Sequence, residues 1–116
     1  MNVYIVGMVS KGGTLSAVEI RANLRNFAAA EKELKAYGHL VYSPPWHNPD
    51  GDFEPSTTRQ GWQWYMREDI KALMEADAIY LIPGWEGSEG SEMEVGLARR
   101  LGMSEFGPGR LEINPS

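Results

Sequence analysis

Cysteine is absent from this chain of 116 residues, which excludes disulfides, thiolate nucleophiles and zinc–thiolate sites. Only two histidines are present, His39 and His47, and their spacing fits no zinc motif. No apolar run approaches the ~20 residues that a membrane-spanning helix needs. Acidic side chains outnumber basic ones, and the net charge of −5 argues against a protein that grips phosphate backbones. We therefore expect no nucleic-acid partner, no membrane partner, no metal and no cofactor.

The remaining composition is that of an ordinary globular protein, with 42% hydrophobic and 23% charged residues. At this length we expect one domain covering residues 1–116. Residues 1–4 show no basic region followed by an apolar stretch, as a secretory signal would. We therefore expect a cytoplasmic protein.

Short apolar runs alternate with helical patterns along the chain. Strands are predicted at residues 3–6, 40–42 and 78–82 with a further edge strand at 111–113, and helices at 16–37, 61–76 and 91–101. This alternation predicts a single small α/β domain, in which a parallel sheet carries helices on both faces. Ligands of such sheets bind beyond the carboxyl ends of the strands. The glycine-rich loops 7–14 and 83–90 both follow strands and belong at that edge.

Two acidic residues fall on apolar helix faces. Asp69 lies three residues after Met66 and four before Leu73, and Glu94 lies four residues before Ala98. Acids that face inward are rarely buried without a partner or a task. A pair of carboxylates suits substitution at an anomeric carbon, because one can attack or shield the oxocarbenium-like centre while the other handles the leaving group.

Each acid also has a purely structural explanation. Glu94 follows Ser91 by three residues, which is the spacing of a capping box at the start of a helix. For Asp69 this explanation is an ion pair with Arg67, Lys71 or another arginine. A purely structural explanation of both acids at once is weaker, because both are expected near the one edge of the sheet where ligands bind.

The glycine-rich loops are candidates for binding a nucleotide. Small residues let backbone N–H groups approach phosphate oxygens, and hydroxyls and indole rings in these loops could bind phosphate and a base. Neither a P-loop nor a GxGxxG motif is present, so tight turns explain the loops equally well. The candidate substrate-binding residues are Gly7, Ser10, Lys11, Gly12, Gly13, Trp46, Trp85, Ser88, Gly90 and Ser91.

Residues 90–98 read Gly-Ser-Glu-Met-Glu-Val-Gly-Leu-Ala. This segment resembles the G-[ST]-x-x-E-x-G-x-A segment of the nucleoside 2-deoxyribosyltransferase superfamily. Residues 65–70, 76–79 and 81–85 are similar to a branch of that superfamily, a domain of unknown function found in phage and bacterial genomes. The strand and glycine at 4–7, the Asn-Phe-Ala-Ala-Ala helix segment at 26–30 and the strand before Pro44 match as well. The resemblance covers roughly residues 3–102.

The resemblance implies a Rossmann-like fold, usually a homodimer, that acts on the N-glycosidic bond of deoxynucleosides or their 5′-phosphates. By position, Glu94 matches the nucleophile and Asp69 matches the acid that contacts or protonates the base. Ser88 matches a serine that binds phosphate in the 2′-deoxynucleoside 5′-phosphate N-hydrolases, where the transferases tend to carry an acid. Residues 10–13 resemble the first phosphate loop of these hydrolases, with Lys11 in place of arginine.

The leading hypothesis from the sequence is an N-glycosidase of 2′-deoxynucleoside 5′-monophosphates with Glu94 as nucleophile. Two alternatives stay open. One is a nucleoside 2-deoxyribosyltransferase, and the other is a nucleotide-binding or sensor domain without catalysis.

Overall fold

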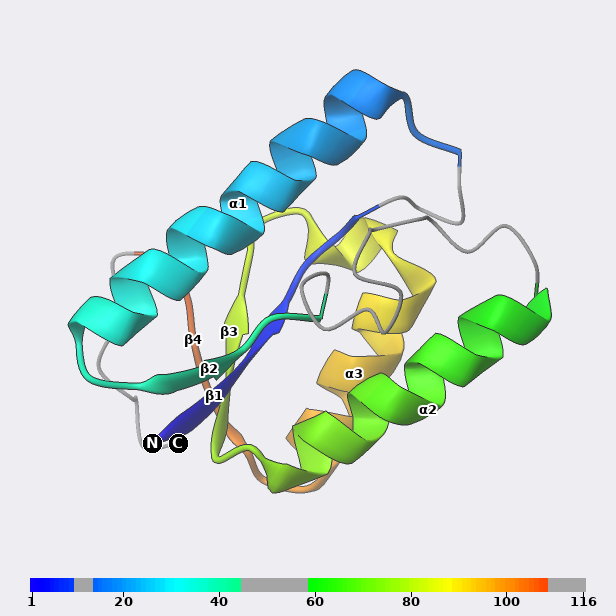
Figure 1. Cartoon of the computed structure of the whole chain (residues 1–116). Helices are drawn as coiled ribbons and strands as arrows, with labels where there is room; N and C mark the ends of the chain where they lie inside the picture. The colour runs from blue at the N-terminus through cyan, green and yellow to red at the C-terminus, as the bar shows by residue number, and fades with distance from the viewer. Residues whose placement is uncertain (10–13, 45–58, 109–116) are drawn as a thin grey trace.

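Four parallel strands form the centre of the molecule in the order β2–β1–β3–β4 (Figure 1). The computed structural model describes residues 1–9, 14–44 and 59–108, apart from the side chains of residues 59, 60 and 62. The strands are β1 (Asn2–Val6), β2 (Leu40–Tyr42), β3 (Ala78–Leu81) and β4 (Ser104–Phe106). The first three strands were predicted. β4 was not, and the predicted strand at 111–113 lies outside the described residues.

The sheet is buried on both faces. Successive side chains of the inner strand β1 point to opposite faces, and those on each face are apolar or aromatic. Val3 and Ile5 of β1 belong to one core cluster, and Tyr4 and Val6 belong to the other. The run of β-branched residues in β1 fits such a position. Parallel register places Tyr4 opposite Tyr42 of β2, which becomes important for the site.

Helix α1 (Ala17–Ala36) covers the first face, where Phe27, Ala30 and Leu34 pack into the cluster. The helix begins at Ser16, whose Oγ accepts the Glu19 N–H at 3.2 Å while the Glu19 carboxylate accepts the Ser16 N–H at 3.1 Å. This is a complete capping box. The chain leaves the helix through Gly38 at φ +88°, a conformation that favours glycine.

Helices α2 (Arg59–Glu75) and α3 (Glu89–Arg100) cover the second face together (Figure 1). Leu73 of α2 and Val95 and Ala98 of α3 pack against Tyr4 and Ile79 of the strands. The predicted parallel sheet with helices on both faces is therefore confirmed. None of the described helices combines the length and the apolar character that a membrane crossing demands.

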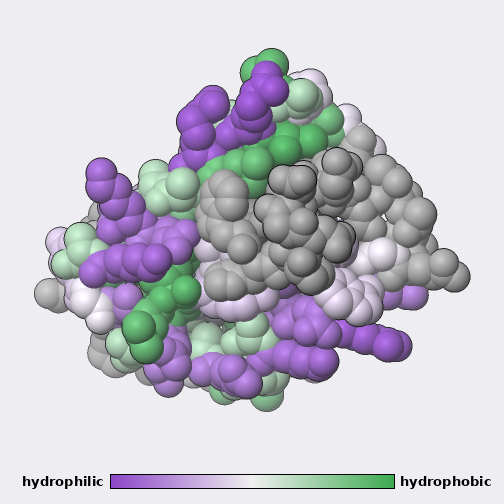
Figure 2. Space-filling view, in the orientation of Figure 1, coloured by the Kyte–Doolittle hydropathy of each residue, from purple (hydrophilic) through white to green (hydrophobic). Residues whose placement is uncertain are grey.

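Hydrophilic residues take up most of the described surface in the view of Figure 2, and the hydrophobic areas between them are small. Large exposed hydrophobic side chains do occur in the described residues, among them Val18, Leu40, Met93 and Leu101. Scattered residues of this kind are normal on a globular protein.

Candidate active site

The start of helix α3 differs from the prediction, and the difference bears on Glu94. The N-cap is Ser88, whose Oγ accepts the Ser91 N–H at 3.3 Å. Ser91 itself is 2% exposed and donates its hydroxyl to the Gly7 carbonyl at 2.9 Å. The predicted capping box of Ser91 and Glu94 is therefore wrong, because Ser91 lies inside the helix. Glu94 consequently has no capping role to explain its position.

Glu94 is a buried carboxylate, 6% exposed, on the face of α3 that packs against the sheet. Among the described residues, its Oε2 has no hydrogen-bond partner. Burial raises the pKa of Glu94 to about 8, the nearby Tyr4 hydroxyl lowers it, and the negative charge of Asp69 raises it. The fully buried Tyr4 hydroxyl also lacks a partner with good hydrogen-bond geometry among the described residues. A buried polar pair of this kind is ready to bind a further polar group.

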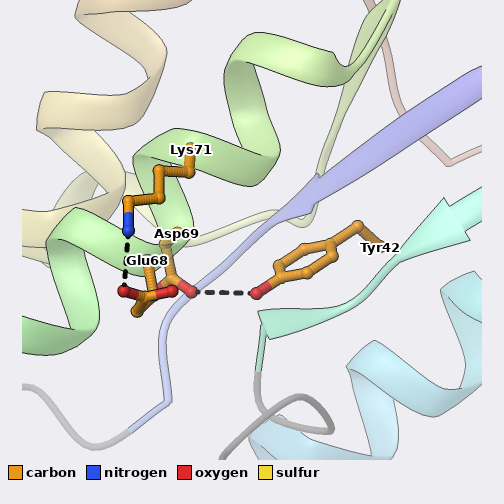
Figure 3. Close-up of polar contacts among 4 residues, drawn as sticks. All are labelled: Tyr42, Glu68, Asp69 and Lys71. Carbon is orange, nitrogen blue, oxygen red and sulfur yellow. Dashed lines mark hydrogen bonds and ion pairs between the residues drawn. The ribbon is translucent and has the colours of Figure 1, made fainter.

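Asp69 reaches from α2 toward the sheet, where the Tyr42 hydroxyl donates to its Oδ1 at 3.4 Å (Figure 3). Burial raises the pKa of Asp69 to about 7, the bond from Tyr42 lowers it, and the charge of Glu68 raises it. Lys71 binds Glu68 at 3.1 Å (Figure 3). The alternative in which Lys71 pairs with Asp69 is therefore not what the structure shows, because Lys71 pairs with the neighbouring Glu68.

Two tyrosines that the sequence did not single out complete this cluster. The rings of Tyr4 and Tyr42 stack with centroids 5.3 Å apart and an interplanar angle of 12°. Burial raises the pKa of both hydroxyls, and Asp69 and Glu94 add to the effect in each case. Both tyrosines therefore stay protonated and can donate hydrogen bonds to the acids. In the sequence they read as ordinary core aromatics, since only the register of the strands brings them together.

The predicted substrate-binding residues of the two glycine-rich loops have different surroundings. Gly7 packs so closely that an added Cβ would lie 3.0 Å from Ile82 and from Phe27, so its lack of a side chain serves packing. Gly90 is buried in the first turn of α3. Ser88 is half-buried at the helix start. Residues 10–13 and Trp46 lie outside the described residues.

Trp85 packs against the second core cluster instead of standing free. The Arg99 guanidinium lies 5.5 Å from the centre of its ring. Arg99 also binds the Glu105 carboxylate at 2.8 and 3.1 Å. The Trp85 ring, which was expected to stack on a base, is thus already in contact with a cation.

Within the described segments, no three side chains of histidine, aspartate or glutamate gather closely enough to hold a metal ion. The described side chains of the site offer two carboxylates with raised pKa values and two tyrosine hydroxyls. Two titratable acids in one site, each with a pKa near neutrality, suit a reaction in which one acts ionised and the other protonated.

The site and the fold define a small α/β domain with a buried pair of acids on one face of a parallel sheet. The chain belongs to the family described as Domain of unknown function (DUF4406), whose model matches residues 1–105. A comparison with the curated proteins finds no match.

Among solved structures, the chain resembles a 2-deoxyribosyltransferase from the psychrotolerant bacterium Bacillus psychrosaccharolyticus. The two are 19% identical, the TM-score is 0.66, and the alignment covers 98% of this chain and 77% of that one. At this identity the likeness concerns the fold. It confirms the predicted Rossmann-like fold.

Proposed function

We propose that the protein cleaves the N-glycosidic bond of 2′-deoxynucleoside 5′-monophosphates, releasing a free base and 2-deoxyribose 5-phosphate. The observation that carries this proposal is Glu94, a buried carboxylate that has no capping role and whose Oε2 has no partner among the described residues. Burying such a group without a hydrogen-bond partner costs stability, and groups of this kind gather at functional sites. The fold likeness to a 2-deoxyribosyltransferase supports a reaction at the anomeric carbon of deoxyribose.

The two acids share one proton in the proposed reaction, and the reactive form is the one in which Asp69 carries it and Glu94 is ionised. The Glu94 carboxylate then attacks C1′ as the bond between C1′ and the base nitrogen breaks. The electron pair of that bond leaves with the base, which takes the proton of Asp69. Water then attacks C1′ of the glycosyl ester and gives its proton to the ionised Asp69, which restores Glu94 and completes hydrolysis with retention. The Tyr4 hydroxyl, which already lowers the pKa of Glu94, stabilises the ionised nucleophile.

The assignment of a 5′-phosphate rests on Ser88. Its Oγ accepts a backbone N–H at the start of α3, so the hydroxyl keeps its own proton to donate to an anion. The start of a helix favours negative charge, which adds to this donor. The loop at residues 10–13 would hold the same phosphate by resemblance to the N-hydrolases.

The test is incubation of the protein with each common 2′-deoxynucleoside 5′-monophosphate, with chromatographic detection of free base. We expect base release by the wild type and none by Glu94→Ala. Glu92→Ala is the matched control, because Glu92 is an exposed acid on the same helix and should leave turnover unchanged. Unchanged release by Glu94→Ala would contradict the assignment of the nucleophile.

Deoxyribosyl transfer to a second base is the other candidate reaction, and the similar solved structure is what favours it. Both reactions share the glycosyl ester on Glu94 and differ only in what attacks it. Adding an excess of a second free base separates them. A transferase would then form a new nucleoside or nucleotide, whereas a hydrolase would still release sugar phosphate. Saturable binding of nucleotide with no base released would favour a sensor domain instead.

A further inference from the structure

Tyr42 links the sheet to the acid on helix α2. It is the last residue of β2 and lies opposite Tyr4 in the parallel register. Its ring stacks on Tyr4, and its hydroxyl crosses to the Asp69 carboxylate at 3.4 Å (Figure 3). We infer that Tyr42 is a positioning residue of the active site, which holds Asp69 in place to act on the departing base. This inference rests on the proposed function.

The geometry favours this role because ring stacking and strand register together fix the position of the Tyr42 side chain. Tyr4 is fully buried, so it gives the Tyr42 ring a rigid surface to stack on. The register of two strands therefore sets where the Tyr42 hydroxyl lies. A catalytic side chain held by such packed neighbours keeps its orientation better than one on a free helix surface.

The electrostatic surroundings explain why a hydroxyl is needed at this point. Within the described part of the chain, the titratable groups that face Asp69 are Tyr4 of β1, Tyr42 of β2, Glu68 of its own helix and Glu94 of α3. Glu68 and Glu94 are acids, although Lys71 partly balances Glu68. The bond from Tyr42 lowers the pKa of Asp69 against burial and against Glu68. Without that hydroxyl, Asp69 would hold its proton more tightly and give it up less readily.

The test uses Tyr42→Phe, which keeps the ring and its stack but removes the hydroxyl. We expect kcat for base release to fall about tenfold, in line with the loss of one hydrogen bond to a charged group, with KM little changed. The titration of the Asp69 carboxyl, followed by carbon NMR, should move to higher pH, and the pH profile of kcat/KM should shift in the same direction. Tyr37→Phe is the matched control, because Tyr37 is 61% exposed, and it should change neither quantity.

A double-mutant cycle then asks whether Tyr42 acts through Asp69. In an Asp69→Asn background, Tyr42→Phe should cause no further loss of kcat. Equal losses with and without Asp69, or an unshifted Asp69 titration in an active enzyme, would overturn the role of Tyr42 alone. Failure of the proposed function looks different: the wild type would release no base while Tyr42→Phe still shifted the Asp69 titration.

Discussion

Glu94 occupies a position where an uncharged side chain would make the protein more stable. It is 6% exposed among apolar neighbours such as Val95 and Ala98. Its Oε2 gains no compensating hydrogen bond from the described residues. Proteins commonly accept such a loss of stability where activity needs a destabilised group. The same residue should therefore show opposite effects on activity and on stability when it is replaced.

Replacing Glu94 with Gln should stabilise the protein at alkaline pH while it stops base release. The folded-state pKa of Glu94 is raised to about 8, above that of an exposed glutamate, so the folded state binds this proton more tightly. The stability that this proton gives is complete below the unfolded-state pKa and is lost as the pH rises through about 8. Urea unfolding at pH 6 and pH 9 should show the advantage of the variant growing by on the order of 2 kcal/mol.

Glu92→Gln is the control for this experiment, because Glu92 is exposed on the same helix and its replacement should give the same small difference at both pH values. If the advantage of Glu94→Gln did not grow with pH, Glu94 would not hold its proton in the folded state.

The pH profile of kcat/KM should be a narrow bell. The proposed reaction needs one proton on the pair of acids, which titrate near 7 for Asp69 and near 8 for Glu94. Because the two acids interact, the limbs report the pair and not one residue each. We expect the maximum between the two values and the loss of one limb in Asp69→Asn. A flat profile from pH 5 to pH 9 would contradict a reaction that depends on this pair.

At the scale of the element, the two serine N-caps offer a matched comparison. Ser16 caps α1 and Ser88 caps α3, each with its Oγ accepting a backbone N–H three residues on. Replacing either with Ala should destabilise the protein by about 1 kcal/mol. Only Ser88→Ala should also raise KM for a deoxynucleoside monophosphate, because only that hydroxyl is proposed to bind phosphate. An equal KM for both variants would remove Ser88 from the phosphate site.

The elements that the sequence predicted well carry their own local signals. Helix α1, predicted at 16–37 and observed at Ala17–Ala36, has an N-cap serine and a C-terminal glycine. Strand β4 was missed because Ser104–Phe106 contains no apolar run, and its pairing with β3 decides its structure. Tertiary contacts override weak local patterns in this way.

The errors in the candidate site have the same origin. A serine followed three residues later by Glu94 looked like a cap, but the bond from Ser91 to Gly7 joins residues 84 positions apart, which no local pattern contains. The contact of Tyr42 with Asp69 depends on the register of two strands and on where α2 crosses them. Both acids could be found from helical spacing alone, whereas their tyrosine partners could not.

At the scale of the whole molecule, the proposed chemistry is confined to one side of the sheet. Tyr4, Tyr42, Asp69 and Glu94 all lie on the face that α2 and α3 cover, whereas α1 packs on the other face (Figure 1). The acids come from two helices and the tyrosines from two strands, so the site exists only when these elements are packed together. A ligand that binds there binds the folded chain and stabilises it as a whole.

This linkage separates an enzyme from a sensor in one thermal unfolding experiment. At a 2′-deoxynucleoside monophosphate concentration of 100 times Kd, the folded state should gain about 2.7 kcal/mol and unfold several degrees higher. In the wild type the gain should fade with incubation time, because the nucleotide is hydrolysed. In Glu94→Gln it should persist, because the variant keeps the shape of the site but lacks the nucleophile. A gain that persists equally in both proteins would identify a nucleotide-binding domain without turnover.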